Sequence, residues 1–555
     1  MTRISAIEIE NFQSIQQLTR IDLKPITLLF GPNSAGKSSV FDALELLTIL
    51  LDPTKFNSDL AKNKVDRWAR RTSDDPVRKT FLAVEFPFNF IEFYELWGKD
   101  SNWPDNLIRT HHPKFYWDDE DSVKSNELEG ATVRIELHIE IINKVASTEA
   151  YLSECLISLK NLPLLRISKK HPTDKTAEEF TQISSDHLYC DRWLTVYDTL
   201  SYGFHESDNS STVLISTALR PLSITKSSYA NDLGEDPKGL CRIASDAFFY
   251  FGTILFMSKR DQPGIVMSDR RAPKPNEALT VVDLGLKGWW SRSSFSASSP
   301  ASLLKSISHD LDEHYQGLAE ITHADLLLRT ANADFWGSSH AAKHIEPIRN
   351  KARILEIVNH HLEKNLFTEK LYKLSCAATL MVPIDLNEDD PWSYYALAQP
   401  AAVRLFLQDG EGQKVDFHDV GSGIPFVLPI LYAVACQGFV KVQQPELHLH
   451  PALQSSLADV FVEELNRGGS DQFLIETHSE HFLLRLLRRI RDSERNKCLS
   501  TEMKLTNKDL AVYYFDPQIS GGTVVTQQLV TPLGDFYTDW PRGFFAERNR
   551  DLFDE

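Results

Sequence analysis

A short glycine-rich segment near the amino terminus constrains the fold of this chain more than any other feature. The segment GPNSAGKS, residues 31–38, follows the apolar run Ile26–Phe30 and precedes residues 38–51, whose apolar side chains recur at helical spacing. In a strand, glycine loop and helix of this kind, the loop amides and the positive end of the helix point toward one place. The sequence therefore predicts an α/β fold with a phosphate-binding P-loop at the end of a buried strand.

The residue types in this loop indicate a nucleotide with its metal ion. Lys37 is expected to reach the β- and γ-phosphates, and the Ser38 hydroxyl is expected to ligate Mg²⁺. The other positions expected to bind the nucleotide are Gly31, Asn33, Ser34, Ala35, Gly36 and Ser39. The predicted cofactors are ATP and Mg²⁺. A chance match is the alternative, and the strand and helix on either side argue against it.

Strand and helix patterns at the two ends of the chain predict one α/β domain interrupted by a long insertion. The 555 residues exceed one ordinary domain. We predict an amino-terminal part at 1–90, an inserted region of mixed strands and then helices at 91–374, and a carboxyl-terminal part at 375–555. The elements expected in the first two parts are strands at 6–10, 18–23, 26–30, 133–142 and 151–167, and helices at 38–51, 302–319, 342–365 and 368–374.

The carboxyl-terminal part is expected to form a parallel sheet, because its strands alternate with helices. The expected elements are a hairpin of 403–407 with 415–417, strands at 439–442 and 472–476, and helices at 451–466 and 481–492.

Charge and cysteine content exclude several classes of protein. Lys and Arg number 59 against 77 Asp and Glu, a net charge of −18, so bulk charge cannot hold nucleic acid. Contact with nucleic acid would need a local basic patch, and one basic run lies within residues 485–497. A solvated helix face is the simpler interpretation of that run. The six cysteines form no Cys-x-x-Cys pair, which excludes a zinc ribbon and suits a reducing cytoplasm.

One uncharged segment, residues 420–440, has the length of a membrane span. Gly421, Gly423, Pro425 and Pro429 interrupt it, so a buried helix that continues into a buried strand explains it better. The amino terminus lacks the apolar core of a signal peptide. We therefore expect a cytoplasmic protein without membrane contact.

Three carboxyl-terminal segments follow the P-loop in a meaningful order. DVGSG, residues 419–423, opens a predicted helix, and its amides could bind phosphate, although a plain loop is the alternative. QQPELHLHP, residues 443–451, follows a buried strand. The next strand ends before His478, which could sense a γ-phosphate; taken alone, such a histidine is more often an ordinary polar residue.

Together, GPNSAGKSS, DVGSG, QPELHLHP and THSEHF resemble the SMC/RecF/OLD-like branch of ABC ATPases, of the kind placed in the AAA family. The closing WPRGFF, residues 540–545, resembles the ending of that branch. Within the branch, the chain resembles the PtuA ATPases of Septu and retron anti-phage systems. The resemblance implies an α/β fold, namely an ABC-type P-loop ATPase head with a large inserted helical and loop region.

The resemblance further implies that nucleotide is held between two protomers, as a homodimer or a higher even oligomer. Lys37 and Ser38 of one protomer would face the signature residues of the other, which here are Gly421, Ser422 and Gly423. His478 would contact the γ-phosphate, and His450 would lie in the D-loop at the dimer interface.

Two positions, Gln443 and Phe426, depart from the pattern of the branch, whose members often carry a glutamine at the position of Gln444. Gln443 stands where the Walker B strand normally ends in an acid that orders Mg²⁺, and Gln444 stands where many ABC enzymes have a catalytic glutamate. A neutral amide adds no negative charge to the metal and cannot act as a base. Slow hydrolysis, substitution by Glu446, and an engineered Glu-to-Gln change remain alternatives. Phe426 also replaces a glutamine that is frequent after the signature glycines.

The sequence lacks the carboxylate cluster of a Toprim nuclease and the histidine cluster of an HNH nuclease. The paired histidines His111–His112 and His360–His361 are interpreted as surface or cap residues. The resemblance then implies that the chain hydrolyses ATP and controls a separate nuclease effector, HNH-type and PtuB-like, in anti-phage defence. The alternatives are a RecF/SMC-like DNA-repair ATPase that binds DNA directly, and a scaffold with a degenerate ATP site.

Overall fold

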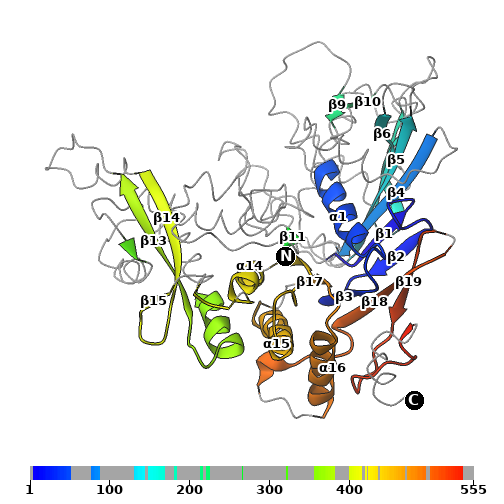
Figure 1. The fold of residues 1–555 in the computed structure, drawn as a ribbon. Coiled ribbons are helices and arrows are strands. Elements are labelled where there is room, and N and C mark those ends of the chain that lie inside the picture. Colours follow the sequence, from blue (N-terminus) through cyan, green and yellow to red (C-terminus); the bar gives the residue numbers. More distant parts are fainter. Residues whose placement is uncertain are drawn as a thin grey trace, which may run out of the picture. The chain divides into compact units, whose positions relative to one another are not determined.

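The fold is taken from a computed structural model of the whole chain (Figure 1). The residues that it describes are 4–51, 77–87, 131–143, 148–159, 161–168, 180–183, 213–216, 221–224, 265–266, 321–322, 356–381, 399–415, 419–421, 423–435, 438–468, 472–495, 500–519 and 521–541. Contacts divide the chain into two compact units. The first comprises Met1–Leu23, Gly31–Lys259 and Phe515–Thr526, and the second comprises Lys24–Phe30, Arg260–Tyr514 and Gln527–Glu555.

The first unit contains a seven-stranded sheet whose neighbouring strands are all antiparallel. Its strands, in spatial order, are β2 (Thr19–Asp22), β1 (Ala6–Glu10), β4 (Val77–Pro87), β5 (Thr132–Asn143), β6 (Thr148–Leu159), β7 (Leu162–Ser168) and β8 (Phe180–Ile183). Along β5, Val133, Ile135 and Leu137 are buried and alternate with half-buried polar residues. This period of two is the reason the segment forms a strand with one face in the core. The strand predicted at 133–142 is confirmed, whereas the segment predicted as one strand at 151–167 forms parts of two antiparallel strands, β6 and β7.

A network of charges crosses the other face of this sheet. Arg134 donates to Glu8 at 2.6 Å and to Glu85 at 2.6 Å, and Arg20 donates to the same two carboxylates at 2.8 and 2.6 Å. The hydrogen bond from Arg134 holds the pKa of Glu8 below its usual value, and the hydrogen bond from Arg20 does the same for the pKa of Glu85. The network therefore fastens β2, β1, β4 and β5 to one another at neutral pH.

Two further elements of the first unit complete its description. β9 (Val213–Ser216) and β10 (Pro221–Ile224) pair as a small antiparallel sheet. α1 (Ser38–Leu51) begins where the glycine loop ends and buries Phe41, Leu44 and Leu47. The predicted helix at 38–51 is confirmed.

The second unit contains a largely parallel sheet, as predicted. The sheet has six strands in the order β11 (Ile265–Val266), β16 (Phe439–Gln443), β17 (Gln472–Glu476), β3 (Ile26–Phe30), β18 (Leu510–Pro517) and β19 (Thr523–Gln528). Each pair from β11 to β18 is parallel. All five residues of β3 and of β17 are buried, which is typical of a parallel sheet covered on both faces. The end of β18 and most of β19 belong to the first unit.

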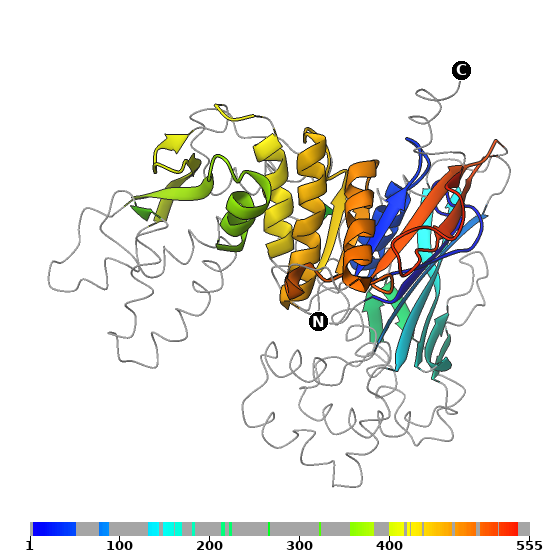
Figure 2. The same ribbon diagram turned by 90° about the horizontal axis from the view of Figure 1, so that it is seen from below.

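Three helices of the second unit stand side by side in Figure 2: α14 (Gly423–Ala435), α15 (Pro451–Gly468) and α16 (Glu480–Glu494). α16 begins at Ser479, whose side chain accepts from the backbone N–H of Phe482 at 3.0 Å and so caps the helix. Its buried residues, at helical spacing, are Phe482, Leu483, Leu486, Leu487 and Ile490. These three helices and the strands between them confirm the predicted carboxyl-terminal elements.

The uncharged segment 420–440 forms α14 and leads into β16, as expected of a buried helix and strand. α14 has Pro429 inside it and nearly all of its described side chains are buried. Among the described residues, no helix combines the length and the apolar character that crossing a membrane requires.

A four-stranded sheet precedes α14, in the order β12 (Ile321–Thr322), β13 (Lys373–Met381), β14 (Gln399–Gln408) and β15 (Lys414–Val415). β14 and β15 form the predicted hairpin, in which Leu407 lies opposite Val415. The Asp409 side chain accepts from the backbone N–H groups of Glu411 and Gln413, which fixes the turn.

The helix predicted at 368–374 is wrong. Residues 356–361 are helical and continue as the π-helical turn η5 (Leu362–Leu366). The chain then turns, with Leu371 at a φ of 49°, and enters β13 at Lys373. Pairing of Lys373 with Gln408 across the sheet prevails over local helical spacing. The helix predicted at 302–319 and most of the one at 342–365 lie outside the described residues.

Candidate functional site

The glycine loop of the first unit adopts a conformation that only glycine permits at two positions. Gly31 has a φ of 146°, and a Cβ there would lie 2.5 Å from the Phe515 carbonyl oxygen. Gly36 has a φ of 87°, and a Cβ there would lie 1.7 Å from Ser14 Oγ. Both glycines thus have a steric reason as well as a predicted role in presenting amides.

Lys37 lies inside this loop. Its side chain is buried, and Nζ donates to the carbonyl oxygens of Gly31 at 3.0 Å and Pro32 at 2.9 Å. The loop therefore closes around a cationic amine, as expected of a phosphate cradle. Of the other predicted nucleotide-binding residues, Asn33, Ser34 and Ser38 are exposed, and Ala35 and Ser39 are buried.

The turn between β1 and β2 also contacts the loop, and no motif had indicated it. Ser39 Oγ donates to Gln13 Oε1 at 2.7 Å, and Gln13 Nε2 donates to Asp42 on α1 at 2.6 Å. Gln13 has a φ of 49°, and the Ser14 and Ser39 hydroxyls lie 3.3 Å apart. The only available signal was the polar sequence NFQSI, residues 11–15, between two predicted strands.

In the second unit, the carboxyl ends of β3, β16 and β17 lie at one edge of the parallel sheet. Gln443 on β16 lies beside Glu476 on β17, which in turn lies beside Leu29 on β3. The Gln444 N–H donates to the Glu476 carbonyl oxygen at 2.7 Å, and Gln444 has a φ of 46°. Gln443 and Glu476 are both buried. The sequence had not singled out Glu476, because its position next to Gln443 depends on strand order.

Glu446 connects the loop after β16 to the loop after β17. One carboxylate oxygen accepts from the Thr477 hydroxyl at 2.7 Å, and the other accepts from the His478 backbone N–H at 2.7 Å. Thr477 Oγ1 accepts in turn from the Ser479 N–H at 3.0 Å. Glu446 therefore fixes the backbone of the predicted switch histidine at the start of α16.

The predicted signature glycines lie at the start of α14. Gly421 is exposed, Gly423 is the first residue of the helix, and Ser422 lies outside the described residues. A Cβ on Gly423 would lie 3.1 Å from Leu449 Cδ2 and 3.3 Å from the His448 carbonyl oxygen. The start of α14 is thus packed against the segment 446–450.

The same segment makes a second contact with α14 and then opens α15. The rings of Phe426 and His448 are in contact at a tilt of 44°, with centroids 4.2 Å apart, so the residue that stands where relatives often have a glutamine has a packing role. His450, predicted in the D-loop, is exposed. Its Nδ1 accepts from the Ala452 N–H at 3.3 Å, and its carbonyl oxygen accepts from Leu453 at 2.8 Å. His450 is therefore the last residue before α15.

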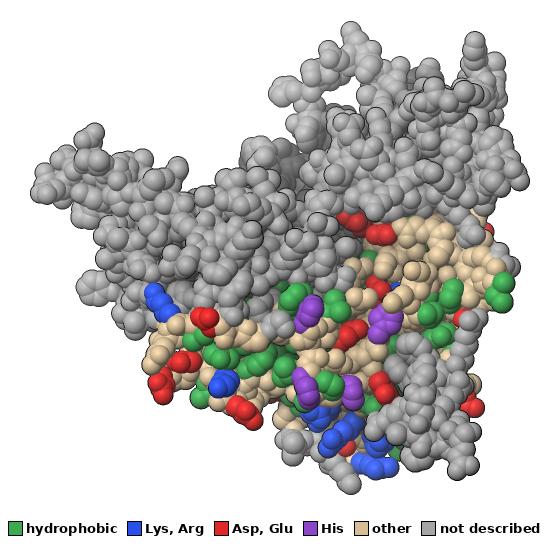
Figure 3. All heavy atoms as spheres, in the orientation of Figure 1, with side chains coloured by type: hydrophobic (Ala, Val, Ile, Leu, Met, Phe, Trp, Pro, Cys, Tyr) green, Lys and Arg blue, Asp and Glu red, His purple; other side chains and the backbone are tan. Residues whose placement is uncertain are grey.

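The basic run on α16 has intramolecular partners. Arg489 makes two hydrogen bonds to Asp459 on α15, at 2.7 and 2.8 Å, and Arg485 lies 3.2 Å from the same carboxylate. Arg491 lies 3.0 Å from Asp535. Blue side chains gather over α16 at the lower edge of Figure 3, with red side chains among them. Much of the positive charge of this run is therefore offset within the unit, which disfavours its use for nucleic acid.

Trp540, which begins the closing WPRGFF segment, packs against the strand that leads to the glycine loop. Its ring meets Phe30 edge-on at a centroid distance of 5.6 Å and contacts Phe536 at 4.9 Å. Residues 542–545 of the segment lie outside the described part of the chain.

Two family matches agree with this arrangement. Residues 3–203 match the family described as "AAA ATPase domain", and residues 260–485 match the family described as "AAA domain, putative AbiEii toxin, Type IV TA system". The chain thus carries AAA-family ATPase domains. With the parallel sheet and the glycine loop before α1, these matches agree with a P-loop ATPase fold.

Comparison with solved structures gives SMC heads at low identity. An SmcHead bound to the C-winged helix domain of ScpA has a TM-score of 0.37 and 11% identity, with 94% of this chain and 98% of that chain covered. An Smc head from Pyrococcus furiosus with an extended coiled coil, bound to the C-terminal domain of ScpA, has a TM-score of 0.34, 11% identity and coverages of 95% and 96%. The SMC head domain of Thermotoga maritima has a TM-score of 0.33, 9% identity and coverages of 94% and 98%. No curated protein matches the sequence.

ATP binding is expected to depend on Lys37. Lys37→Ala removes the amine at the centre of the loop, and we expect the Kd for ATP, measured by calorimetry, to rise at least about tenfold, or roughly 1.4 kcal/mol. Lys508→Ala, at an exposed lysine before β18, is the matched control and should bind as wild type. Unchanged ATP affinity in a folded Lys37→Ala protein would contradict the assignment of this loop.

Proposed function

We propose that the chain is a regulator that dimerises around ATP and controls a separate nuclease in anti-phage defence. The observation that carries the proposal is the segment 446–450 of the second unit. Through Glu446 it holds the loop with His478, and through His448 and Leu449 it touches the first turn of α14. A change at the γ-phosphate sensor is thus linked mechanically to the helix expected to face a second protomer, which is what an ATP-dependent switch requires.

The nucleotide-binding role is assigned to the glycine loop, with Lys37 for the β- and γ-phosphates. Mg²⁺ would be held by the exposed Ser38 hydroxyl at the start of α1 and by Gln443, and when bound it would offset phosphate charge. Gln443 offers only an amide oxygen. The buried Glu476 carboxylate, one strand away and in register, is our candidate for the negative charge that Gln443 lacks.

Residues of the loops after β16 and β17 are assigned the roles of sensing the γ-phosphate and positioning the attacking water. His478 contacts the γ-phosphate, and Gln444 orients the attacking water. Glu446 was predicted to be catalytic, and its two hydrogen bonds to Thr477 and His478 support a positioning role through the histidine. Because the Glu446 carboxylate is engaged by these two donors and Gln443 and Gln444 are neutral amides, we expect slow hydrolysis.

The defence role and the HNH-type effector rest on the resemblance of the motifs to PtuA ATPases. The description of the second matched family, which names a putative toxin of a type IV TA system, agrees with a place in a multi-component system. The ion pairs of Arg485 and Arg489 with Asp459 make direct DNA binding through α16 the weaker alternative. The identity of the neighbouring genes distinguishes the defence role from direct DNA binding, because an adjacent gene for an HNH nuclease favours defence.

Gln443 is expected to limit ATP turnover. Gln443→Glu restores a carboxylate at the end of β16, and we expect steady-state phosphate release to rise at least about tenfold, which corresponds to roughly 1.4 kcal/mol of barrier. His478→Ala in the Gln443→Glu background should abolish the gain. Lys37→Ala is the control for phosphate released by a contaminating enzyme.

Two variants test the alternatives at the same site. Glu476→Gln should slow hydrolysis if Glu476 compensates for Gln443. Glu446→Gln keeps an acceptor oxygen for one of the two donors that bond to Glu446. If Glu446 only positions His478, the rate of ATP hydrolysis should fall in part and its dependence on pH should not change. No gain from Gln443→Glu, with full loss in Glu446→Gln, would move the catalytic role to Glu446 and contradict our assignment.

Association is expected to depend on both ATP and the signature segment. Ser422→Arg places a bulky cation at the predicted protomer face, so the increase in mass that ATP produces in wild type, measured by light scattering, should be lost while the fold is kept. Ser500→Arg, at an exposed serine whose side chain makes no cap hydrogen bond, adds the same cation elsewhere and is the matched control. An ATP-stimulated mass equal to wild type in Ser422→Arg would show that the segment is only a loop.

The chain alone is expected not to cut DNA. Purified protein with Mg²⁺ or Mn²⁺ should leave plasmid and single-stranded DNA intact in a gel assay. Metal-dependent cleavage that co-purifies with the chain through successive columns, and disappears with a single substitution in it, would overturn the need for a separate nuclease.

A further inference from the structure

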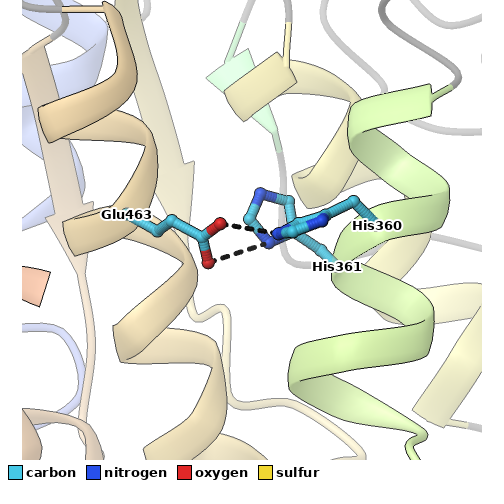
Figure 4. Close-up of side chains that lie close together, drawn as sticks. All are labelled: His360, His361 and Glu463. Atoms are coloured by element: carbon cyan, nitrogen blue, oxygen red, sulfur yellow. Dashed lines mark hydrogen bonds and ion pairs between the residues drawn. The ribbon is translucent and has the colours of Figure 1, made fainter. Parts of the chain in front are cut away.

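A second polar cluster lies in the second unit, on the side of α15 that faces the segment before β13. His360 and His361 end the helical residues 356–361, and Glu463 faces them from α15 (Figure 4). Glu464 is the next residue of α15. The histidine pair had been expected to be surface or cap residues. His361 is not at the surface, because its side chain is fully buried, and it is the N-cap residue of η5. His111 and His112 lie outside the described residues.

The distances within the cluster suit a small metal ion. His360 Nε2 lies 2.6 Å from Glu463 Oε1, and His361 Nδ1 lies 3.9 Å from Glu463 Oε2. One ligand atom from each of these three residues can be chosen so that all lie within 4.8 Å of one another. In a tetrahedral site with bonds of 2.0–2.1 Å, ligand atoms lie about 3.3 Å apart. Small side-chain rotations would therefore bring the three residues to metal-binding geometry.

The neighbouring carboxylate has the position of a supporting group. His361 Nε2 lies 2.8 Å from Glu464 Oε1, which leaves Nδ1 on the side of Glu463 and Asn365. A metal-bound histidine usually donates its other N–H to a carboxylate in this way. Glu464 is completely buried, and its second oxygen, Oε2, has no hydrogen-bond partner among the described residues.

The charges of the buried side chains in the cluster also favour a bound cation. Arg467 bonds to both Glu463 and Glu464, so one guanidinium faces two buried carboxylates. A divalent ion would supply the remaining positive charge, which is costly to omit in a buried site. His360 and Arg467 are about one-quarter exposed, at 25% and 23%, and give the ion a path from solvent.

We propose that His360, His361 and Glu463 bind a divalent transition metal of the zinc class, with Glu464 as the positioning residue for His361. Two imidazoles favour zinc and its neighbours over Mg²⁺ or Ca²⁺, which prefer all-oxygen sites. The ion replaces the Asn365 hydrogen bond at His361 Nδ1. It clamps the π-helical segment η5 and the helix before it to α15.

The clamp has a structural role. Glu463 lies about 18 Å along α15 from the start of the helix at Pro451, at 1.5 Å per residue, and the D-loop residue His450 precedes that start. The ion is therefore remote from the loops after β16 and β17. It fixes the orientation of α15, the helix that the D-loop opens.

The test uses the full chain, without nucleotide, and Zn²⁺ alone as the probe. We expect one tightly bound zinc ion per wild-type chain by metal analysis and calorimetry, a rise in Tm on its addition, and a visible absorption band when Co²⁺ is used instead. His361→Asn and Glu463→Gln should weaken zinc binding at least about a hundredfold, and Glu464→Gln should weaken it about ten- to a hundredfold.

The matched control is His481→Asn, which removes an exposed histidine of α16 and should bind zinc as wild type. His360→Asn, at the more exposed ligand, keeps the test valid should His361→Asn fail to fold, and it should also lose the ion. No zinc binding by the wild type, or binding that is equal in wild type, His360→Asn and Glu463→Gln, would overturn the proposal. The cluster would then be a hydrogen-bonded clamp only.

Discussion

The parallel pairing of β16, β17 and β3 is the constraint on which the second unit depends. These strands are almost wholly buried, so their order and register are fixed by the side chains that pack against both faces of the sheet. In a parallel sheet all carboxyl ends meet at one edge. The register therefore places Gln443 beside Glu476 and starts the loops after β16 and β17 at the same edge.

Glu446 links the loop after β16 to the loop after β17. A loop lacks the regular backbone hydrogen bonds of a strand or helix, so its polar groups need other partners. Here the Glu446 carboxylate accepts hydrogen bonds from both the His478 N–H and the Thr477 hydroxyl. The same segment packs on α14 through the contact between the Phe426 and His448 rings. These contacts attach the predicted sensor histidine, His478, to the packing of α14 and α16, so a small movement at one loop would displace the others together, as the proposed switch requires.

The cluster of His360, His361, Glu463 and Glu464 shows how an inserted segment is joined to this framework. Apolar contact alone would leave the two buried carboxylates without compensation, and Arg467 offsets only part of their charge. The π-helical turn η5 follows His361 directly and ends at Leu366. Such turns recur where a side chain has to be aimed, which agrees with a site built around the histidine pair.

The sequence by itself determined the elements whose signal is local. The glycine loop between Ile26–Phe30 and α1, the hairpin of β14 and β15, and the helices α15 and α16 follow from spacing, capping and turn residues. Tertiary structure decided what depends on residues distant in the chain. Pairing with β14 makes the segment that begins at residue 373 a strand. Packing of α15 places Glu464 beside His361, although the two residues are about a hundred positions apart in the sequence. Tertiary structure also set Glu476 beside Gln443. Local spacing cannot encode these contacts, because strand order and helix packing are settled only by burial of the whole core.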